Sequence, residues 1–298
     1  MLLRSLGLGL AVYGAGAVKS TDAVEAAIND ALGEHKVIVS VFVDGGWDGL
    51  SLLTPLGSDS RHQARLKALR PTLSSLTPAS QLLPFGADPS LSWHPAAAGL
   101  RDLWDDPSVG VAVAPSVGYG SPNYSHFTSR HFWEVGALDV GGTTGWMGRY
   151  LDRVGRPDVP LQGVSMGDAL SPTLATSSAA VAAIYDMDTF GHTFSGGAGA
   201  LAAAATQELR ALGLTPSGDV QRDQSRIVTD MAFDLAADLA PAVAVEQPMT
   251  AYPTTPSYFV DSLKDTARLL SARSSGSALP VRCVALKAHG AFDTHSRQ

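Results

Sequence analysis

The segment Lys36-Val-Ile-Val-Ser-Val-Phe-Val43 decides the fold class of this chain. Its run of apolar, mostly β-branched residues predicts a strand that is buried on both faces, as in a parallel sheet. A second apolar run at 109–114 predicts another strand of the same kind. Shorter apolar segments predict three further strands, at 162–167, 180–185 and 280–286.

Helical patterns lie between these strands. The apolar spacing and the capping residues predict helices at 21–33, 62–69, 94–105, 125–135, 145–154, 197–212, 221–245 and 257–273. Strands that alternate with helices predict an α/β fold, with a doubly wound, mostly parallel sheet flanked by helices. The change to an Ala-rich composition at 186–256 predicts a helical insertion within one domain that covers 21–298.

The composition limits the class of partner. The chain has 298 residues, of which 45% are hydrophobic and 16% are charged, so it is globular rather than disordered. The net charge of −7, with no basic stripe, argues against nucleic acid as a partner. A small anionic substrate remains compatible, because a bound metal ion would dominate the local field. The sequence leaves the oligomeric state open.

The single cysteine, Cys283, lies in the apolar segment 281–286. With no second cysteine in the sequence, an intramolecular disulfide is excluded, and so is a zinc site built from several thiolates. Its apolar neighbours predict that Cys283 is a small residue of the core rather than a reactive thiol.

The first twenty residues have the features of an export signal. A short positive start, Met1-Leu-Leu-Arg4, is followed by an apolar run from Ser5 to Val18. Ala15-Gly16-Ala17 matches the small-residue pattern of a signal-peptidase site. The run is too short to span a bilayer, and we expect no membrane span once the signal is removed. The expected location is periplasmic or secreted, and a buried N-terminal helix is the alternative.

Polar residues follow three of the expected elements. Asp44 and Asp48 come after the first strand, Ser125 opens a helix after a Gly/Ser/Pro loop, and Asp293 and His295 follow the last strand. Sites in parallel α/β sheets form at the carboxyl ends of strands. Carboxylates and an imidazole suit a divalent metal such as zinc, calcium or magnesium. The alternative to metal binding is that Asp44 and Asp48 only form a turn and that Asp293 lies in a solvated loop.

Three residues bear on the chemistry of the candidate site. His289 lies near Asp293 and offers a third metal ligand or a supporting group. Ser125 is a candidate nucleophile, activated by metal coordination and by the positive end of its helix, although it also suits an N-cap. Gly163-Val-Ser165-Met-Gly167 matches the nucleophile elbow of α/β-hydrolases, but Pro172 and the absence of a helical pattern after it argue against that interpretation.

Five motifs in order give the chain a resemblance to a known family. It resembles domain-of-unknown-function family 1501, bacterial exported proteins of the alkaline phosphatase and sulfatase superfamily. The matching segments are Val41-Phe-Val-Asp-Gly-Gly-Trp-Asp-Gly-Leu-Ser-Leu-Leu-Thr-Pro55, Trp93-His94-Pro95, Ser125-His126-Phe127 with Trp133-Glu134, Thr144-Gly-Trp-Met-Gly-Arg149, and Gly290-Ala-Phe-Asp-Thr-His295.

The resemblance implies an alkaline-phosphatase-like fold. It implies metal ligands at Asp48, Asp293 and His295, with Asp44 as the alternative to Asp48. It also implies that His94 and His126 lie near the pocket. By analogy with sulfatase-type enzymes, Ser125 is the nucleophile. The family begins with a twin-arginine motif and continues past Asp-Thr-His to an Asp-His-Gly motif, so we expect a shortened chain that lacks the C-terminal part of the fold.

Two functions follow as expectations. The first is a metal-dependent hydrolase that cleaves small anionic phosphate or sulfate esters. The second is a non-catalytic, truncated exported domain that binds a ligand or has no function.

Overall fold

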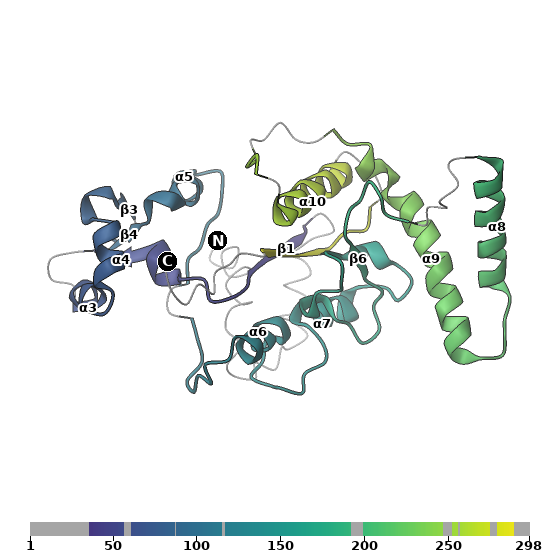
Figure 1. Ribbon diagram of the computed structural model, residues 1–298, viewed down its shortest axis with the longest axis horizontal. Coiled ribbons are helices and arrows are strands. Elements are labelled where there is room, and N and C mark those ends of the chain that lie inside the picture. Colours follow the sequence, from purple (N-terminus) through teal and green to yellow (C-terminus); the bar gives the residue numbers. More distant parts are fainter. Residues whose placement is uncertain are drawn as a thin grey trace. The chain divides into compact units, whose positions relative to one another are not determined.

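The computed structural model describes residues 36–56, 61–86, 88–114, 117–191, 199–246, 252–255, 257–274 and 279–288 (Figure 1). These residues form two compact units. Unit 1 contains the described part of 43–126, and unit 2 contains the described parts of 36–42 and 127–288. The expected export signal, the helix at 21–33 and the loop from 289 onward lie outside the described residues.

Unit 2 is built on a four-stranded sheet. Its strands are β1 (Ile38–Val43), β5 (Gly163–Met166), β6 (Ala182–Ile184) and β7 (Cys283–Ala288), in the order β1-β7-β5-β6. β5 pairs in parallel with both β6 and β7, so that Val164 lies opposite Ala182 on one side and Val284 on the other. The predicted class is therefore confirmed at the level of a mixed α/β fold with a parallel four-stranded sheet.

Alternate residues of β7 enter two different cores. Val284 and Leu286 belong to one apolar cluster, whereas Cys283 and Ala285 belong to another. Successive side chains of a strand point to opposite faces of its sheet, so each cluster marks one covered face. The prediction that Cys283 is a core residue is confirmed, since it is fully buried.

Helices cover both faces of this sheet (Figure 1). α10 (Tyr258–Ser274) and α9 (Val220–Val243) contribute Leu269 and Leu239 to the first cluster. α7 (Trp146–Val154) contributes Met147 and Leu151 to the second. α6 (His126–Val135) precedes α7, and the short 3-10 helices η5 (Pro160–Gln162) and η6 (Pro172–Leu174) flank β5 in the chain.

The segment 186–256 contains a helical hairpin. α8 (Ala200–Leu214) lies side by side with α9 in Figure 1. Arg210 of α8 forms ion pairs with Asp230, at 3.1 Å, and with Asp234 of α9. The Asp219 carboxylate caps α9 by accepting a hydrogen bond from the Arg222 backbone N–H at 2.9 Å. Both helices therefore arise where the Ala-rich composition predicts them.

Two strand predictions are wrong. β1 is not buried on both faces, since Val39 is 39% exposed and Val41 is 45% exposed. The reason is its position at one end of the described strand order, where it has a single neighbour. The segment 109–114 is not a strand, and Val109 in it is 38% exposed. It belongs to unit 1, whereas the parallel sheet belongs to unit 2.

Unit 1 has a small antiparallel sheet that the sequence did not predict. β4 (Leu91–Trp93) lies between β2 (Leu53–Pro55) and β3 (Leu83–Pro84). Trp93 is almost fully buried against Phe85 and Trp104, whose ring centroids lie 5.5 and 6.4 Å from its own. These aromatic rings form the centre of an apolar cluster that also includes Leu53 and Ala97.

The remaining elements of unit 1 are short helices. They are α2 (Gly49–Leu52), α3 (Arg61–Leu69), α4 (Pro71–Leu76), η3 (Ala79–Gln81), η4 (Pro95–Ala97) and α5 (Ala98–Asp105). In both units, the described helices include none with the length and apolar character needed to cross a membrane.

Candidate functional site

The loop that follows β1 approaches the start of α6. Gly45 and Gly46 have φ angles of +92° and +83°, a conformation that favours glycine. A Cβ atom at Gly46 would lie 2.9 Å from Cε1 of His126. The two glycines therefore give the loop between Asp44 and Asp48 its turn, and Gly46 allows the imidazole of His126 to pack against the backbone.

Asp48 is held by two short hydrogen bonds. Its Oδ2 accepts a bond from Ser51 Oγ at 2.5 Å and another from Arg70 Nη1 at 2.5 Å. Partial burial alone would raise the pKa of Asp48, but the bonds from Arg70 and Ser51 and the charge of Arg70 outweigh it. The pKa of Asp48 is therefore lowered, and the side chain is a carboxylate at neutral pH.

His94 uses both of its ring nitrogens within the protein. Nδ1 accepts a hydrogen bond from the Ala96 backbone N–H at 3.1 Å, which caps η4. Nε2 lies 3.2 Å from Thr77 Oγ1. Because Nδ1 accepts, a neutral ring carries its proton on Nε2 and donates it to Thr77. This arrangement makes His94 a positioning residue that ties η4 to the end of α4.

Asp48 and His94 line the same hollow of unit 1. The hollow has a volume of about 570 Å³, and Ser51 and Trp47 also line it. Its remaining lining residues are Leu52, Ala96, Ala97, Gly99 and Leu100. The tertiary structure thus gathers a carboxylate, a hydroxyl and an imidazole from two segments that the sequence separates by more than forty residues.

The sequence analysis did not identify Ser51 and Arg70 as residues of the candidate site. Ser51 stands three residues after Asp48, a spacing at which a hydroxyl and a carboxylate often meet in a turn, so this signal was present. Arg70 follows α3 and stands immediately before α4, where no local pattern connects it to Asp48.

Ser125 lies immediately before α6. Its backbone N–H donates to Asn123 Oδ1 at 3.0 Å, and the residue is half-buried. Tyr124, which precedes it, is 92% exposed and has a φ angle of +57°. Bulky residues rarely adopt this left-handed conformation, so the backbone is strained next to Ser125. Ser125 therefore stands at the positive end of α6, beside the residue that contacts Gly46.

Ser165 has a structural role instead of a nucleophilic one. It is buried within β5, where its hydroxyl donates to the Ala169 carbonyl at 3.2 Å and accepts from the Ser171 N–H at 3.0 Å. The bends that follow at 167–169 do not open an α-helix, so the strand-turn-helix geometry of a nucleophile elbow is not formed.

The predicted ligands are only partly described. Asp44 follows β1 directly and is half-buried. Asp293, His295 and His289 lie outside the described residues. Within the described ranges, no three His, Cys, Asp or Glu side chains gather closely enough to hold a metal ion.

The protein is a mixed α/β protein, and the hollow lined by Asp48, Ser51 and His94 is its candidate functional site. Comparisons with protein-family models, with curated proteins and with solved structures found no match.

Proposed function

We propose that this chain is an exported, metal-dependent hydrolase of small phosphate or sulfate esters, with an alkaline-phosphatase-like fold of the family 1501 type. The observation that carries the proposal is the packing of His126 against Gly46. Through this contact, the helix start that carries Ser125 lies against the loop that carries Asp44 and Asp48. A hydroxyl and two carboxylates are the groups that metal-assisted ester hydrolysis requires.

The carboxylates fit a divalent cation. The lowered pKa of Asp48 keeps it ionised, and carboxylate oxygens are ligands for magnesium, calcium and zinc. His94 does not fit as a ligand, because both of its ring nitrogens are engaged. The proposed ligands are those that the family resemblance implies, namely Asp48, Asp293 and His295, with Asp44 as the alternative ligand.

A bound divalent cation would lower the pKa of a coordinated hydroxyl and neutralise charge on the transferring group. The residues of the chain supply the rest. Ser125 attacks the phosphorus or sulfur atom while the ester bond breaks, and the alcohol leaves with the proton of the Ser125 hydroxyl. Water then hydrolyses the resulting serine ester, which releases phosphate or sulfate and restores the hydroxyl. The positive end of α6 stabilises the alkoxide of Ser125. Arg70 keeps Asp48 ionised, and Gly46 and His126 hold the loop against the start of the helix.

Metal content and turnover test this proposal together. Purified protein is dialysed against zinc, calcium or magnesium, its bound metal is measured by mass spectrometry, and hydrolysis of 4-nitrophenyl phosphate and sulfate is followed. Ser125→Ala is expected to abolish turnover and to keep the metal, whereas Asp48→Asn is expected to lower both. Matched controls are Ser129→Ala, in the helix α6 that follows Ser125, and Asp105→Asn on α5. Loss of turnover in Ser129→Ala but not in Ser125→Ala would remove Ser125 from the mechanism.

A non-catalytic binding domain is the second candidate. It is favoured by the internal pairing of the site, since Arg70 neutralises Asp48 and both nitrogens of His94 are engaged without any ligand. Under this alternative, the protein neither retains a metal ion nor turns over either ester. Export is proposed for both candidates, and N-terminal sequencing of secreted protein is expected to show cleavage after Ala17.

A further inference from the structure

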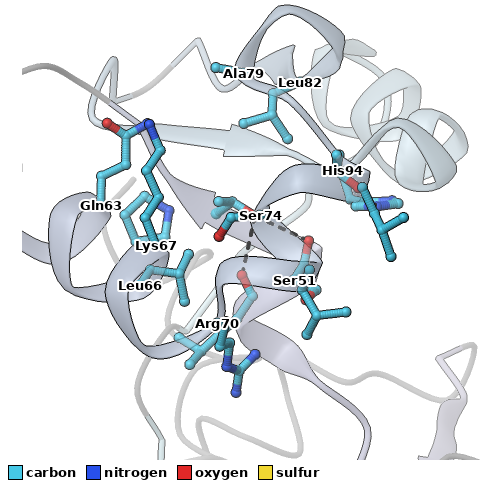
Figure 2. Close-up of a pocket in the computed structure, with 15 residues that line it drawn as sticks. Ser51, Gln63, Leu66, Lys67, Arg70, Ser74, Ala79, Leu82 and His94 are labelled. Atoms are coloured by element: carbon cyan, nitrogen blue, oxygen red, sulfur yellow. Dashed lines mark hydrogen bonds between the residues drawn. The ribbon is translucent and has the colours of Figure 1, made fainter. Parts of the chain in front are cut away.

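A second cavity of unit 1 lies between α3, α4 and β2. It has a volume of about 250 Å³ and fifteen lining residues, which Figure 2 draws as sticks. It shares Ser51 and His94 with the hollow beside Asp48. An engineered cavity of roughly 150 Å³ holds benzene, so this cavity has room for an aromatic ring with a small charged group.

The charge of the lining is unusual for this chain. Lys67 and Arg70 line the cavity and no aspartate or glutamate does so, although the whole chain has a net charge of −7. In Figure 2, Gln63 and Lys67 extend from α3, and the guanidinium of Arg70 lies apart from them. Arg70 is paired with Asp48, whereas Lys67 has no ion-pair partner among the described residues.

The rest of the lining combines apolar side chains with hydroxyl groups. Leu66, Leu73 and Leu82 are half-buried and face the cavity. The hydroxyl-bearing residues of the lining are Ser51, Thr54, Ser74 and Thr77. Small-molecule sites commonly have this composition, in which an apolar wall binds the body of the ligand and a few polar groups orient it.

We propose that this cavity binds a small organic anion, whose apolar ring or short chain lies against the leucines and whose acidic group pairs with Lys67. The carbon skeleton gains free energy by leaving water, and the ammonium of Lys67 selects for negative charge. This binding requires neither a metal ion nor hydrolysis at the neighbouring hollow, and so it stands apart from the proposed enzymatic function.

Phenylphosphonate is a suitable probe, because its carbon–phosphorus bond withstands ester hydrolysis. The full chain, in buffer with EDTA, is titrated with phenylphosphonate by calorimetry and by ligand-observed NMR. Saturable binding is expected, and it should weaken as salt concentration rises. Benzenesulfonate and benzoate are expected to compete with the probe. Benzyl alcohol, which is neutral, is expected to compete poorly.

Two charge-removing variants of the same helix locate the binding. Lys67→Gln is expected to weaken phenylphosphonate about three- to fivefold, as for a charge pair near the surface. Arg65→Gln, which is exposed on α3 and does not line the cavity, is expected to leave the affinity unchanged. Ser74→Phe fills the cavity and is expected to abolish binding, with its thermal unfolding measured as a check on the fold.

Three results would each overturn the proposal. One is the absence of saturable binding by any of the anions. Another is equal affinity for benzyl alcohol and phenylphosphonate, which would remove the role of Lys67. The third is an equal loss of affinity in the Lys67 and Arg65 variants, which would indicate a general charge effect. Catalysis by the protein alters none of these readouts, so the two proposals fail independently.

Discussion

The carboxylate of Asp48 accepts a hydrogen bond from the guanidinium of Arg70 at 2.5 Å, across 22 residues of the chain. Arg70 stands between α3 and α4, whereas Asp48 precedes α2. This ion pair therefore connects the wall of the cavity between α3, α4 and β2 to the hollow that contains the candidate metal ligand. It also supplies the charge that keeps Asp48 ionised.

Replacement of Arg70 by methionine should raise the pKa of Asp48. Arg70 supplies both a hydrogen bond and a charge that lower this pKa. Carboxyl NMR titration is expected to show the Asp48 pKa moving up toward, or above, the ordinary value of about 3.9. Arg65→Met, on the exposed side of α3, serves as the control. An unchanged Asp48 titration in Arg70→Met would show that the pair does not hold in solution.

The same variant should lose stability in a pH-dependent way. Because the pKa of Asp48 is lowered in the folded state, its contribution to stability is present above the unfolded value of about 3.9 and is lost as pH falls through the folded value. Denaturant unfolding at pH 7 is expected to show a loss of about 1 kcal/mol in Arg70→Met. The difference in the free energy of unfolding between Arg70→Met and the parent protein should become smaller in acid.

Asp152 of α7 should stabilise the loop at 177–179. Its carboxylate accepts hydrogen bonds from the backbone N–H groups of Ser177, Ser178 and Ala179, at 2.7, 2.8 and 2.9 Å. Burial opposes the charged form, but these bonds outweigh it and lower the pKa of Asp152 to about 2. Its contribution should therefore be complete above about pH 4 and disappear between about pH 4 and pH 2.

The variant Asp152→Asn tests this contribution. We expect it to lower the free energy of unfolding by about 1 kcal/mol at pH 7, a value reduced by the exposure of the loop. The free energies of unfolding of the variant and the parent protein should become equal near pH 2. Asp105→Asn, on the surface of α5, should change little at either pH. A constant difference across the acid range would mean that the charge of Asp152 is not involved.

Two helical glycines should respond oppositely to alanine. A Cβ atom on Gly148 of α7 would lie 1.9 Å from the Ala175 carbonyl oxygen, a backbone atom. Gly148→Ala is therefore expected to destabilise the protein by about 3 kcal/mol. A Cβ on Gly99 of α5 would meet no atom within 4 Å, and Gly99→Ala should stabilise the helix by roughly 0.5–1 kcal/mol. Thermal unfolding distinguishes the two.

Cys283 should resist thiol reagents in the folded protein. Burial raises the pKa of this thiol to about 12, against a smaller opposing effect of the Arg282 charge. At pH 8, iodoacetamide is expected to leave native Cys283 unmodified and to react fully in guanidinium chloride. Mass spectrometry reports the modified fraction. Rapid labelling without denaturant would contradict the packing of β7 against its neighbours.

Local patterns predicted most of unit 2. The helices α6, α7 and α10 and the strands β5 and β7 all occur close to their predicted positions, because each carries an apolar face or run that only one type of element can bury. Unit 1 was predicted less well. Strands of two or three residues, such as β3 and β4, are too short for a periodic signal, and they form because Trp93 packs on Phe85.

The segment 109–114 shows that a strong local pattern can also predict a strand that does not form. Its valines have a high β propensity, but propensity records how well a residue fits a sheet and does not supply a neighbouring strand. The candidate site likewise contains residues that the sequence indicated and residues that only the tertiary structure revealed. The glycines of the loop and the start of α6 were visible in the sequence, whereas Ser51 and Arg70 were found only through their contacts with Asp48.

The sequence by itself therefore determined the mixed α/β class, most of the helices, the burial of Cys283, and the polar residues after β1 and before α6. The tertiary structure decided that β1 lies at one end of the described sheet, that Asp48 pairs with Arg70, and that Lys67 and the leucines of α3 and α4 face one cavity. The physical reason is range: helices and strands follow from the period of neighbouring residues, whereas an ion pair or a cavity exists only where packing brings distant segments together.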